Sequence, residues 1–370
     1  MKKKIKIVHI ISNLGIGGAE LVLYQLLAHM HDASLVHEVV FFHKGPYQEK
    51  IASLGIKTYH IKGIFPYDPL FLYRLVRCIK KIRPDVLHTS LWAANFLGRL
   101  IAFYYGIIHA ETLHNNVDQN GIVRTLLDRL TASKHGHVVA VSDGIVQSVA
   151  QYTPWFAPVA TIRVIKNGIS SYVLPKEQNQ ISRASLGLTD SHFVIGSVGR
   201  FEPVKNYSLL LTAFALLYDE CSKARLVLVG QGSQEYFLRQ RASDLGIDDR
   251  VVFVIGKDAQ PYYALFDCFV LSSYKEGISM ALLEAMKYQV APIITSSVAT
   301  HEVIIHGENG LLVPASDPEK LAHTIMQLIE SRALKRRLAQ QAVMTVTEQF
   351  QQDKMIAHYT HFYHDIALRR

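Results

Sequence analysis

The sequence predicts an α/β protein with two Rossmann-like domains, each built on a parallel sheet. Short apolar runs rich in β-branched residues alternate with helical patterns along the chain. At 370 residues the chain also exceeds what one hydrophobic core usually serves. A polar stretch without apolar periodicity, residues 167–188, separates the two halves. We therefore expect two parallel sheets that face each other across a cleft, where ligands usually bind.

Thirteen apolar runs are the predicted strands, seven in the first half and six in the second. They lie near Ile5–Ile11, Glu38–His43, Lys57–Ile61, Val86–His88, Ala110–Leu113, Val138–Val141, Ile162–Ile165, Phe193–Val198, Arg225–Val229, Val251–Val254, Cys268–Leu271, Pro292–Thr295 and Leu311–Val313. Because open parallel sheets bind ligands at the carboxyl ends of their strands, residues that directly follow these runs are the candidate site residues.

Composition narrows the class of protein. Hydrophobic content of 49% with 19% charged residues is typical of a globular chain. Three well-separated cysteines fit neither a disulfide framework nor a cysteine zinc site, which favours a reducing cytoplasm. The basic start of the chain lacks a convincing cleavage site and is interpreted as a strand. Segment 91–108 is apolar but contains Asn95 and Arg99, so we expect a buried or interfacial helix rather than a membrane span.

Charge is distributed unevenly between the halves. Residues 1–175 contain 19 Lys+Arg and 10 Asp+Glu, a net charge of +9, whereas residues 176–370 contain 20 and 21, a net charge of −1. Segment Pro69–Pro84 reads as a helix with Arg74, Arg77 and Lys81 on one face. We expect this half to contact an anionic membrane surface, and an ordinary surface helix is the alternative.

The stretch "EGISMALLEAM" predicts an anion site at a helix start. Ser279 is a plausible N-cap, so the N–H groups of residues 280–282 are expected to point out of the helix end, where a phosphate binds. Glu284 leans back toward that end and Glu276 precedes the helix. Carboxylates accept hydrogen bonds from sugar hydroxyls. Alternatively, both glutamates are solvated acids that favour the helix dipole.

The loop "GRFEPVKN" follows the strand Phe193–Val198. Arg200 and Lys205 would be two fixed cations at a strand end, Gly199 permits close backbone approach, and Asn206 can cap the next helix. Without a metal ion, two cations and a helix start can neutralise a departing diphosphate. Solvated surface cations are the alternative interpretation.

The loop "NLGIGGAE" contains Gly17 and Gly18 after the first strand. Glu20 stands where a dinucleotide fingerprint needs its last glycine, which disfavours a dinucleotide site. A backbone loop against a sugar or phosphate and a plain strand-to-helix turn remain open.

Among the 18 histidines, His114 is the preferred candidate because it ends a strand of the first half. His88 is similarly placed but is expected to pack behind it. The pairs His29/His31 and 135/137 have metal-like spacing without an accompanying carboxylate or cysteine cluster, so no metal site is predicted.

Five motifs together resemble the retaining glycosyltransferases of family 4, which have the GT-B fold. They are "GIGGAE", "GRFEPVKN", "VLVGQGS" at Val227–Ser233, the E-x7-E spacing of Glu276 and Glu284, and "NGLLVPASDPEKLA" at Asn309–Ala322. The resemblance implies an N-terminal acceptor-binding domain at 1–170, a nucleotide-sugar-binding domain at 171–352, and a last helix, about 353–370, that packs back on the first domain.

The resemblance also implies roles for residues at matching positions. His114, Arg200, Lys205 and Glu276 would be catalytic, with His114 and Glu276 at the transferred sugar and the two cations at the diphosphate. Glu284 would accept from the ribose hydroxyls. The donor-binding set would be Gly17, Gly18, Gly199, Gly230, Gly277, Ile278, Ser279, Met280, Ala281 and Glu284.

The sequence departs from the family pattern in three places. Ile278-Ser279 stand where relatives usually have Phe-Pro or Phe-Gly, "YQVAPIIT" lacks a usual Gly, and Ala299-Thr300 replace a Gly pair before Glu302. These departures remove no proposed catalytic group. They do mean that the resemblance does not imply which donor sugar this chain uses.

The resemblance therefore predicts a cytoplasmic, metal-independent hexosyltransferase, peripheral on the inner face of the plasma membrane. It would move a sugar from a UDP- or GDP-sugar to a glycan or lipid-linked acceptor in surface polysaccharide biosynthesis. No D-x-D motif is present, no cofactor beyond the donor substrate is expected, and no nucleic-acid partner is expected. The alternatives are a sugar-nucleotide epimerase, a phosphorylase, or a non-catalytic sugar-nucleotide-binding subunit.

Overall fold

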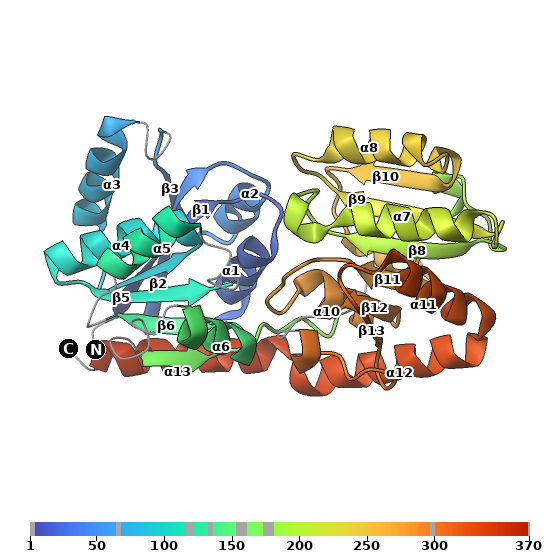
Figure 1. Cartoon of the computed structure of the whole chain (residues 1–370). Helices are drawn as coiled ribbons and strands as arrows, with labels where there is room; N and C mark the ends of the chain where they lie inside the picture. The colour runs from blue at the N-terminus through green and yellow to red at the C-terminus, as the bar shows by residue number, and fades with distance from the viewer. Residues whose placement is uncertain are drawn as a thin grey trace. The chain divides into compact units, whose positions relative to one another are not determined.

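The computed structural model describes residues 4–63, 68–114, 121–131, 136–152, 161–172, 181–296 and 300–368. The chain divides into two units (Figure 1). Unit 1 comprises Met1–Gly168 together with Gln352–Arg370, and unit 2 comprises Ile169–Gln351. Of the predicted polar join, residues 173–180 lie outside the described part.

Unit 1 contains a parallel sheet in the strand order β3-β2-β1-β4-β5-β6-β7. The strands are β1 (Ile5–Asn13), β2 (Leu35–His43), β3 (Lys57–His60), β4 (Val86–Ser90), β5 (Ile108–Leu113), β6 (His137–Ala140) and β7 (Thr161–Val164). Most of these runs are apolar and β-branched, which suits strands whose two faces are both covered by helices.

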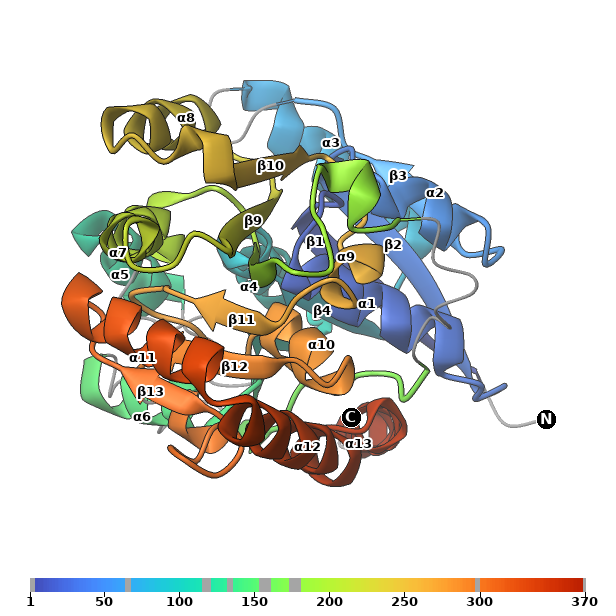
Figure 2. The same ribbon diagram turned by 90° about the vertical axis from the view of Figure 1, so that its right-hand side faces the viewer.

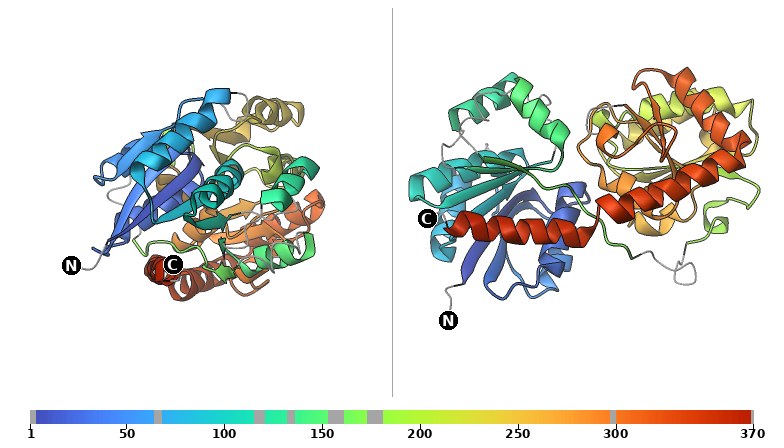
Figure 3. Two further views of the ribbon diagram at one scale, coloured as in Figure 1. Left: turned by 90° about the vertical axis from the view of Figure 1, so that its left-hand side faces the viewer. Right: turned by 90° about the horizontal axis from the view of Figure 1, so that it is seen from below.

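Helices cover both faces of this sheet. They are α1 (Gly18–His29), α2 (Tyr47–Ala52), α3 (Pro69–Ile82), α4 (Trp92–Tyr105), α5 (Ile122–Thr131), α6 (Asp143–Tyr152) and α13 (Gln352–Leu368). Val8 and Ile10 of β1 pack with α3 and α4, whereas Ile11 packs with α1 and α2, because side chains alternate along a strand. Helix α13 follows unit 2 in the sequence but packs on unit 1 (Figure 3), where Tyr363 hydrogen-bonds His88 of β4.

Unit 2 contains a second parallel sheet in the order β10-β9-β8-β11-β12-β13. The strands are β8 (Phe193–Val198), β9 (Ala224–Gly230), β10 (Val251–Ile255), β11 (Cys268–Leu271), β12 (Ala291–Thr295) and β13 (Leu311–Val313). Its core combines strand residues such as Leu226 and Val270 with helix residues such as Leu210 and Phe214, all of them fully buried.

Two groups of helices cover the sheet of unit 2. One face carries α7 (Tyr207–Tyr218), α8 (Glu235–Asp244) and α11 (Pro318–Glu330), and the other carries α9 (Gln260–Tyr263), α10 (Met280–Lys287) and α12 (Arg332–Gln349) (Figure 2). The 3₁₀ turns are η3 (Ala184–Leu186), η4 (Pro203–Lys205), η5 (Asp248–Arg250) and η6 (Thr300–Glu302).

Local sequence signals explain where two of the longer helices begin. Asp68 accepts a hydrogen bond from the amide of Leu70 at 2.8 Å, and Pro69 follows it at the start of α3. Asp317 accepts from the amide of Lys320 at 2.7 Å, and Pro318 follows it at the start of α11. An aspartate N-cap followed by proline is a strong helix start because the cap satisfies a free amide and proline already has a helical φ.

Each sheet has one topological switch point. The chain builds outward from β1 in one direction and then restarts at β4 on its other side, so β1 and β4 are neighbours. In unit 2, β8 and β11 are neighbours for the same reason. Loops that follow two such strands diverge, and the space between them is where open α/β sheets bind ligands.

The fold prediction is confirmed: both halves are Rossmann-like α/β units with parallel sheets, and all thirteen predicted strands are present. Predicted and observed ends differ by up to three residues, as at β2, where pairing with β1 extends the strand to Leu35. The predicted cleft between the sheets stays a prediction. Among the described residues, no helix is both long enough and apolar enough to cross a bilayer.

Candidate active site

The carboxyl edge of unit 2 brings two predicted site residues into direct contact. Lys205 lies in the loop after β8, and Glu276 lies in the loop after β11, the neighbouring strand. Their side chains form an ion pair between Nζ and Oε1. Both are largely buried, which weakens solvent screening of the pair. The switch point of the sheet therefore positions a cation and a carboxylate side by side.

Two consecutive serines, which the sequence analysis did not identify, hold this pair in place. Ser273 Oγ donates to Oε1 of Glu276 at 2.7 Å, and Ser272 Oγ donates to the backbone carbonyl of Lys205 at 2.9 Å. The amide of Tyr274 also donates to the carbonyl of Val204 at 3.0 Å. Their position directly after β11 was the available signal, because residues at that strand end must face the neighbouring loop.

Glycines let three loops pack closely at this edge. A Cβ at Gly230 would lie 1.9 Å from the carbonyl oxygen of Gly199, and one at Gly232 would lie 2.5 Å from that of Phe201. The amide of Gly199 donates to Val229 at 3.0 Å, which fixes the loop after β8 beside the end of β9. Any side chain at Gly230 would therefore displace the loop that carries Arg200 and Lys205.

The other two polar residues predicted in this loop differ from expectation. Arg200 is exposed and forms no ion pair with any described residue, so only Lys205 is held as a fixed cation. Asn206 is the N-cap residue of α7, as predicted, but its side chain makes no capping hydrogen bond: the residue has a φ of 49°, and its Nδ2 donates to the carbonyl of Ala315 at 3.2 Å. The side chain instead ties the loop to the segment after β13.

Helix α10 begins at the predicted residue. Ser279 is the N-cap and accepts from the amide of Leu282 at 3.4 Å. The expectation that residues 280–282 all have free N–H groups is thus wrong for Leu282, because the cap uses that amide. Met280 and Ala281 remain as the helix-start donors, preceded by the buried Gly277 and Ile278. Two amides and the helix dipole still favour an anion here.

Glu284 lies in the second turn of α10, beside a buried tyrosine. Burial, reinforced by the charge of Glu284, raises the pKa of Tyr263 in α9 well above its usual value. Tyr263 stacks on Tyr288 with a ring-centroid distance of 5.7 Å. Burial lowers the pKa of Lys287, and the negative charge of Glu284 opposes that decrease. The half-buried Glu284 is therefore fixed by surroundings different from those of Glu276.

The predicted glycine loop of unit 1 connects β1 to α1. Gly17 is the N-cap of α1 in an extended conformation, and Gly18 is the first helical residue. A Cβ at Gly17 would lie 2.4 Å from Oε2 of Glu20, whose side chain is buried in the first helical turn. A carboxylate thus already occupies the start of α1, and the prediction that this loop is not a dinucleotide site stays a prediction.

His114 directly follows β5, and its Nε2 is inaccessible to solvent without a hydrogen-bond partner among the described residues. Burial lowers the pKa of His114 to about 4, so the imidazole is neutral at pH 7. A neutral imidazole can exchange a hydrogen bond with a hydroxyl of a ligand. His88 is buried and bonded to Tyr363 at 2.6 Å and Thr112 at 2.8 Å, as expected for a packed residue.

Two further features of this edge of unit 1 were not predicted. Ser12 Oγ, near the end of β1, is buried without a partner in the described chain. Leu91, between β4 and α4, has a φ of 73°, which is unusual for a bulky residue. Such strain often marks a functional turn.

No three His, Cys, Asp or Glu side chains within the described ranges are placed to bind one metal ion. His135, one member of a predicted spacing pair, lies outside those ranges, as does Ala299 of the unusual Ala299-Thr300 segment.

Comparison with known proteins identifies the family of each half. Residues 16–171 match the model of Glycosyltransferase Family 4, and residues 178–343 match that of Glycosyl transferases group 1. The N-acetyl-alpha-D-glucosaminyl L-malate synthase of Bacillus anthracis is 25% identical over 343 residues, which cover 90% of this chain and 85% of that protein. The lipopolysaccharide core biosynthesis glycosyltransferase LpsE of Rhizobium meliloti is 32% identical over 174 residues, 47% of this chain and 50% of that protein.

Solved structures show the same fold. Anabaena HepE in complex with UDP-glucose superposes with a TM-score of 0.86 at 20% identity, covering 97% of this chain and 99% of that one. The sucrose-phosphate synthase of Thermosynechococcus elongatus superposes with a TM-score of 0.81 at 20% identity, covering 99% and 100%. Both halves of the chain thus match one type of enzyme in sequence, and the chain belongs to the family 4 glycosyltransferases of the GT-B fold.

Proposed function

We propose that this glycosyltransferase moves a hexose from a UDP- or GDP-sugar to a glycan or lipid-linked acceptor in surface polysaccharide biosynthesis. The ion pair between Lys205 and Glu276 at the switch point of unit 2 carries the proposal. In this proposal Lys205 binds the diphosphate and Glu276 accepts hydrogen bonds from sugar hydroxyls, and their pairing supports a site where both parts of the donor meet. HepE was solved with UDP-glucose, which supports a donor of this class.

The proposed donor contacts follow from the chemistry of each group. Lys205 and the amides of Met280 and Ala281 bind the diphosphate, and the exposed Arg200 folds over it. Glu276 accepts hydrogen bonds from the transferred sugar, and Glu284 accepts from the ribose hydroxyls. In the donor-free protein, Lys205 and Glu276 neutralise each other. Donor binding replaces part of that pairing with a phosphate oxygen on Lys205 and a hydroxyl on Glu276.

The proposed reaction is a substitution at the anomeric carbon with retention of configuration. The bond between that carbon and the β-phosphate oxygen breaks, and a bond to the acceptor oxygen forms on the same face. The proton of the acceptor hydroxyl passes to the departing diphosphate. Because Arg200, Lys205 and the start of α10 stabilise the negative charge of that group, the proposed chemistry is metal-independent.

The roles predicted for Gly17, Gly18 and His114 in unit 1 stay predictions of the resemblance. The neutral His114, whose Nε2 has no hydrogen-bond partner among the described residues, suits a contact with a sugar hydroxyl. The acceptor assignment is supported by a relative whose name places it in lipopolysaccharide core biosynthesis. We accordingly propose a cytoplasmic enzyme that meets its acceptor at the inner face of the plasma membrane.

The test is transfer of labelled sugar from UDP- and GDP-sugars to candidate acceptors, with and without EDTA. We expect transfer to survive EDTA and the product to keep the anomeric configuration of the donor. Arg200→Ala should lower kcat about a hundredfold without lowering the melting temperature, because the side chain is exposed but charge stabilisation is lost.

Arg336→Ala is the matched control, since Arg336 is an exposed arginine of unit 2 on α12. Activity that disappears with EDTA and returns with Mn²⁺ would contradict metal independence. Epimerised sugar nucleotide without any transfer product would instead identify an epimerase. A failure of both UDP and GDP to stabilise the protein thermally would contradict the donor class.

A further inference from the structure

Helix α5 has its apolar residues on the outside. Ile122 is 89% exposed and Leu130 is 73% exposed, and Val123 and Leu126 are exposed as well. The one residue of α5 that is buried is an acid, Asp128, at 7% exposure. A helix that covers a sheet normally buries its apolar residues and exposes its charges. This helix does the reverse, so its outer face is built for an apolar partner.

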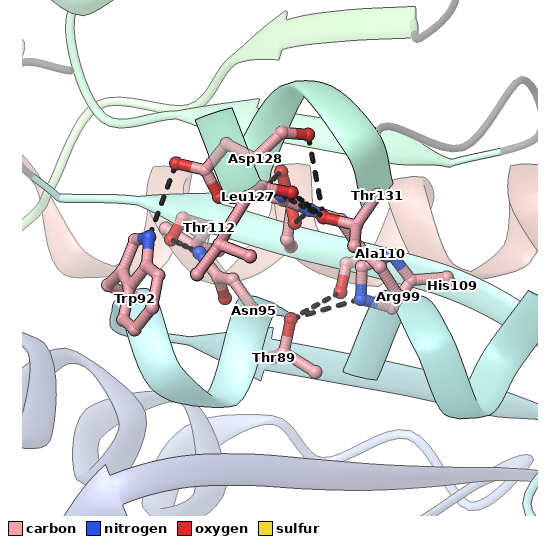
Figure 4. Close-up of polar contacts among 11 residues, drawn as sticks. Thr89, Trp92, Asn95, Arg99, His109, Ala110, Thr112, Leu127, Asp128 and Thr131 are labelled. Carbon is pink, nitrogen blue, oxygen red and sulfur yellow. Dashed lines mark hydrogen bonds and ion pairs between the residues drawn. The ribbon is translucent and has the colours of Figure 1, made fainter. Parts of the chain in front are cut away.

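A buried polar network holds α5 in this orientation (Figure 4). Arg99 of α4 donates to both carboxylate oxygens of Glu111 at 2.7 and 3.1 Å, and to Oδ1 of Asp128 at 2.7 Å. Trp92 Nε1 donates to the other oxygen of Asp128 at 3.3 Å, and Thr131 accepts from Arg99 at 3.2 Å. The network ties the C-terminal part of α5, through Asp128 and Thr131, to α4 and β5.

The neighbouring helix α4 also has exposed aromatic side chains. Phe103 and Tyr104, at the end of α4, are 80% and 78% exposed. Helices α4 and α5 lie side by side, as their shared hydrogen bonds require (Figures 1 and 4). We define the α4–α5 surface by its six strongly exposed members: Phe103, Tyr104, Ile122, Val123, Leu126 and Leu130. Apolar patches of this kind on one protein are normally binding surfaces.

Positive charge surrounds this surface. Arg124 and Arg129 of α5 are exposed, and Lys80 of the neighbouring α3 lies 5.0 Å from the ring centroid of Tyr105. Residues 1–175 carry a net charge of +9. Exposed aromatic and aliphatic side chains flanked by Arg and Lys match the interface of an anionic bilayer, which offers both an apolar layer and negative head groups. A two-fold dimer through the same surface would oppose like charges.

We propose that the α4–α5 surface docks on an anionic lipid leaflet. The apolar side chains enter the head-group region, and Arg124, Arg129 and Lys80 contact lipid phosphates. The inference rests on the proposed function in one respect, because the lipid-linked acceptor of that proposal would lie in such a leaflet. It differs from the contact predicted for α3, where Arg74 is not a free cation because it pairs with Asp68 at 2.6 Å and donates to the carbonyl of Lys62.

The experiment is co-sedimentation of the full chain with vesicles. One set contains phosphatidylcholine alone, and the other contains equal parts of phosphatidylcholine and phosphatidylglycerol. We expect binding to the anionic vesicles that weakens with added salt. The triple variant Ile122→Ser, Leu126→Ser, Leu130→Ser should lower partitioning at least about tenfold, because it removes three inserted apolar side chains. Phe103→Ser with Tyr104→Ser should act in the same direction.

Tyr236→Ser with Phe237→Ser is the matched control. Both residues are exposed on α8 of unit 2, so this variant removes similar apolar area outside the proposed surface and should bind vesicles normally. Calorimetric binding of UDP and GDP is measured on every variant, so loss of docking is separable from loss of the proposed donor site. Absence of vesicle binding, or equal binding by the triple variant, would overturn the proposal. A concentration-dependent dimer that the triple variant abolishes would assign the surface to a second copy instead.

Discussion

Glu276 and Glu284 differ in their surroundings although they are eight positions apart in the sequence. Glu276 is paired with Lys205 and accepts from Ser273, whereas Glu284 lies beside the buried Tyr263. A ligand that reaches Glu276 must compete with an existing ion pair. A ligand that reaches Glu284 meets a carboxylate whose charge acts on Tyr263 and Lys287. The two glutamates should therefore respond differently to nucleotide and to sugar.

Glu284→Ala should weaken binding of free UDP or GDP by about 1–3 kcal/mol, the usual effect of losing a hydrogen bond to a charged group. Glu276→Ala should leave free nucleotide binding nearly intact, since it releases Lys205 for the phosphate, and should strongly lower sugar transfer. Isothermal titration calorimetry with nucleotide and turnover assays with the sugar donor measure the two effects.

Glu319→Ala is the control, because Glu319 is an exposed acid in the first turn of α11 in the same unit. It should change neither quantity. Equal losses of free-nucleotide affinity in the Glu276 and Glu284 variants would refute the proposed division of roles.

At the scale of elements, α5 depends on one buried cation for its attachment. Arg99 is buried and forms ion pairs with both Glu111 and Asp128. Burial raises the pKa of Asp128, and Arg99 opposes that rise. Arg99→Leu should lower the free energy of unfolding of unit 1 by about 3–5 kcal/mol, because it leaves two carboxylates buried without their partner.

Tryptophan fluorescence during urea unfolding measures this change, since both tryptophans of the chain belong to residues 1–168. Arg239→Leu is the comparison: its ion pair with Glu235 on α8 is exposed, and it should change stability by less than about 1 kcal/mol. If Arg99→Leu lowered the free energy of unfolding no more than Arg239→Leu does, the conclusion that the buried network holds α5 in place would be wrong.

At the scale of the whole chain, the C-terminal helix completes the first unit. The buried face of α13 combines apolar side chains such as Phe362 and Ile366 with a polar contact to the sheet: Tyr363 bonds His88, and His9 and His37 lie beside Tyr363. Burial lowers the pKa of His88 to about 3 and that of His37 to about 4. The folded chain therefore keeps both imidazoles neutral well into the acid range.

This arrangement should make unit 1 sensitive to acid. An unfolded histidine takes up a proton below about pH 6.5, whereas the folded state resists protonation until the pH reaches the lower pKa. The free energy of unfolding is therefore unaffected by these histidines above about pH 6.5 and decreases as the pH is lowered below that value. Each of the two histidines should contribute a loss of about 1.4 kcal/mol per pH unit between pH 6.5 and its folded pKa. Urea midpoints at pH 7 and pH 5, followed by tryptophan fluorescence, measure the slope.

His37→Gln with His88→Gln should flatten this pH dependence whatever its effect on stability at pH 7. His358→Gln is the control. His358 is an exposed residue of α13, so this variant should leave the slope unchanged. A double variant with the wild-type slope would show that other groups govern the acid response.

The strands, several helix starts and the sheet edge at which function is expected are all predictable from the amino-acid sequence. Strand positions follow from short apolar runs, as at Phe193–Val198 and Cys268–Leu271, because burial on both faces leaves few polar positions in a strand. Ser279 was predictable as the start of α10, since capping depends on residues three positions apart. Arg200, Lys205, Glu276 and Glu284 were recognised as candidates because they follow strands or begin helices.

Which of these residues contact one another depends on how the elements pack. Lys205 and Glu276 are 71 positions apart and pair because β8 and β11 are neighbours at the switch point, a long-range choice that no local pattern encodes. The side chain of Asn206, the N-cap residue of α7, bonds Ala315 across 109 positions instead of an amide of the helix. The orientation of α5 likewise depends on Arg99, which lies on another helix. Local propensity sets each element, whereas side-chain pairing depends on how the elements pack.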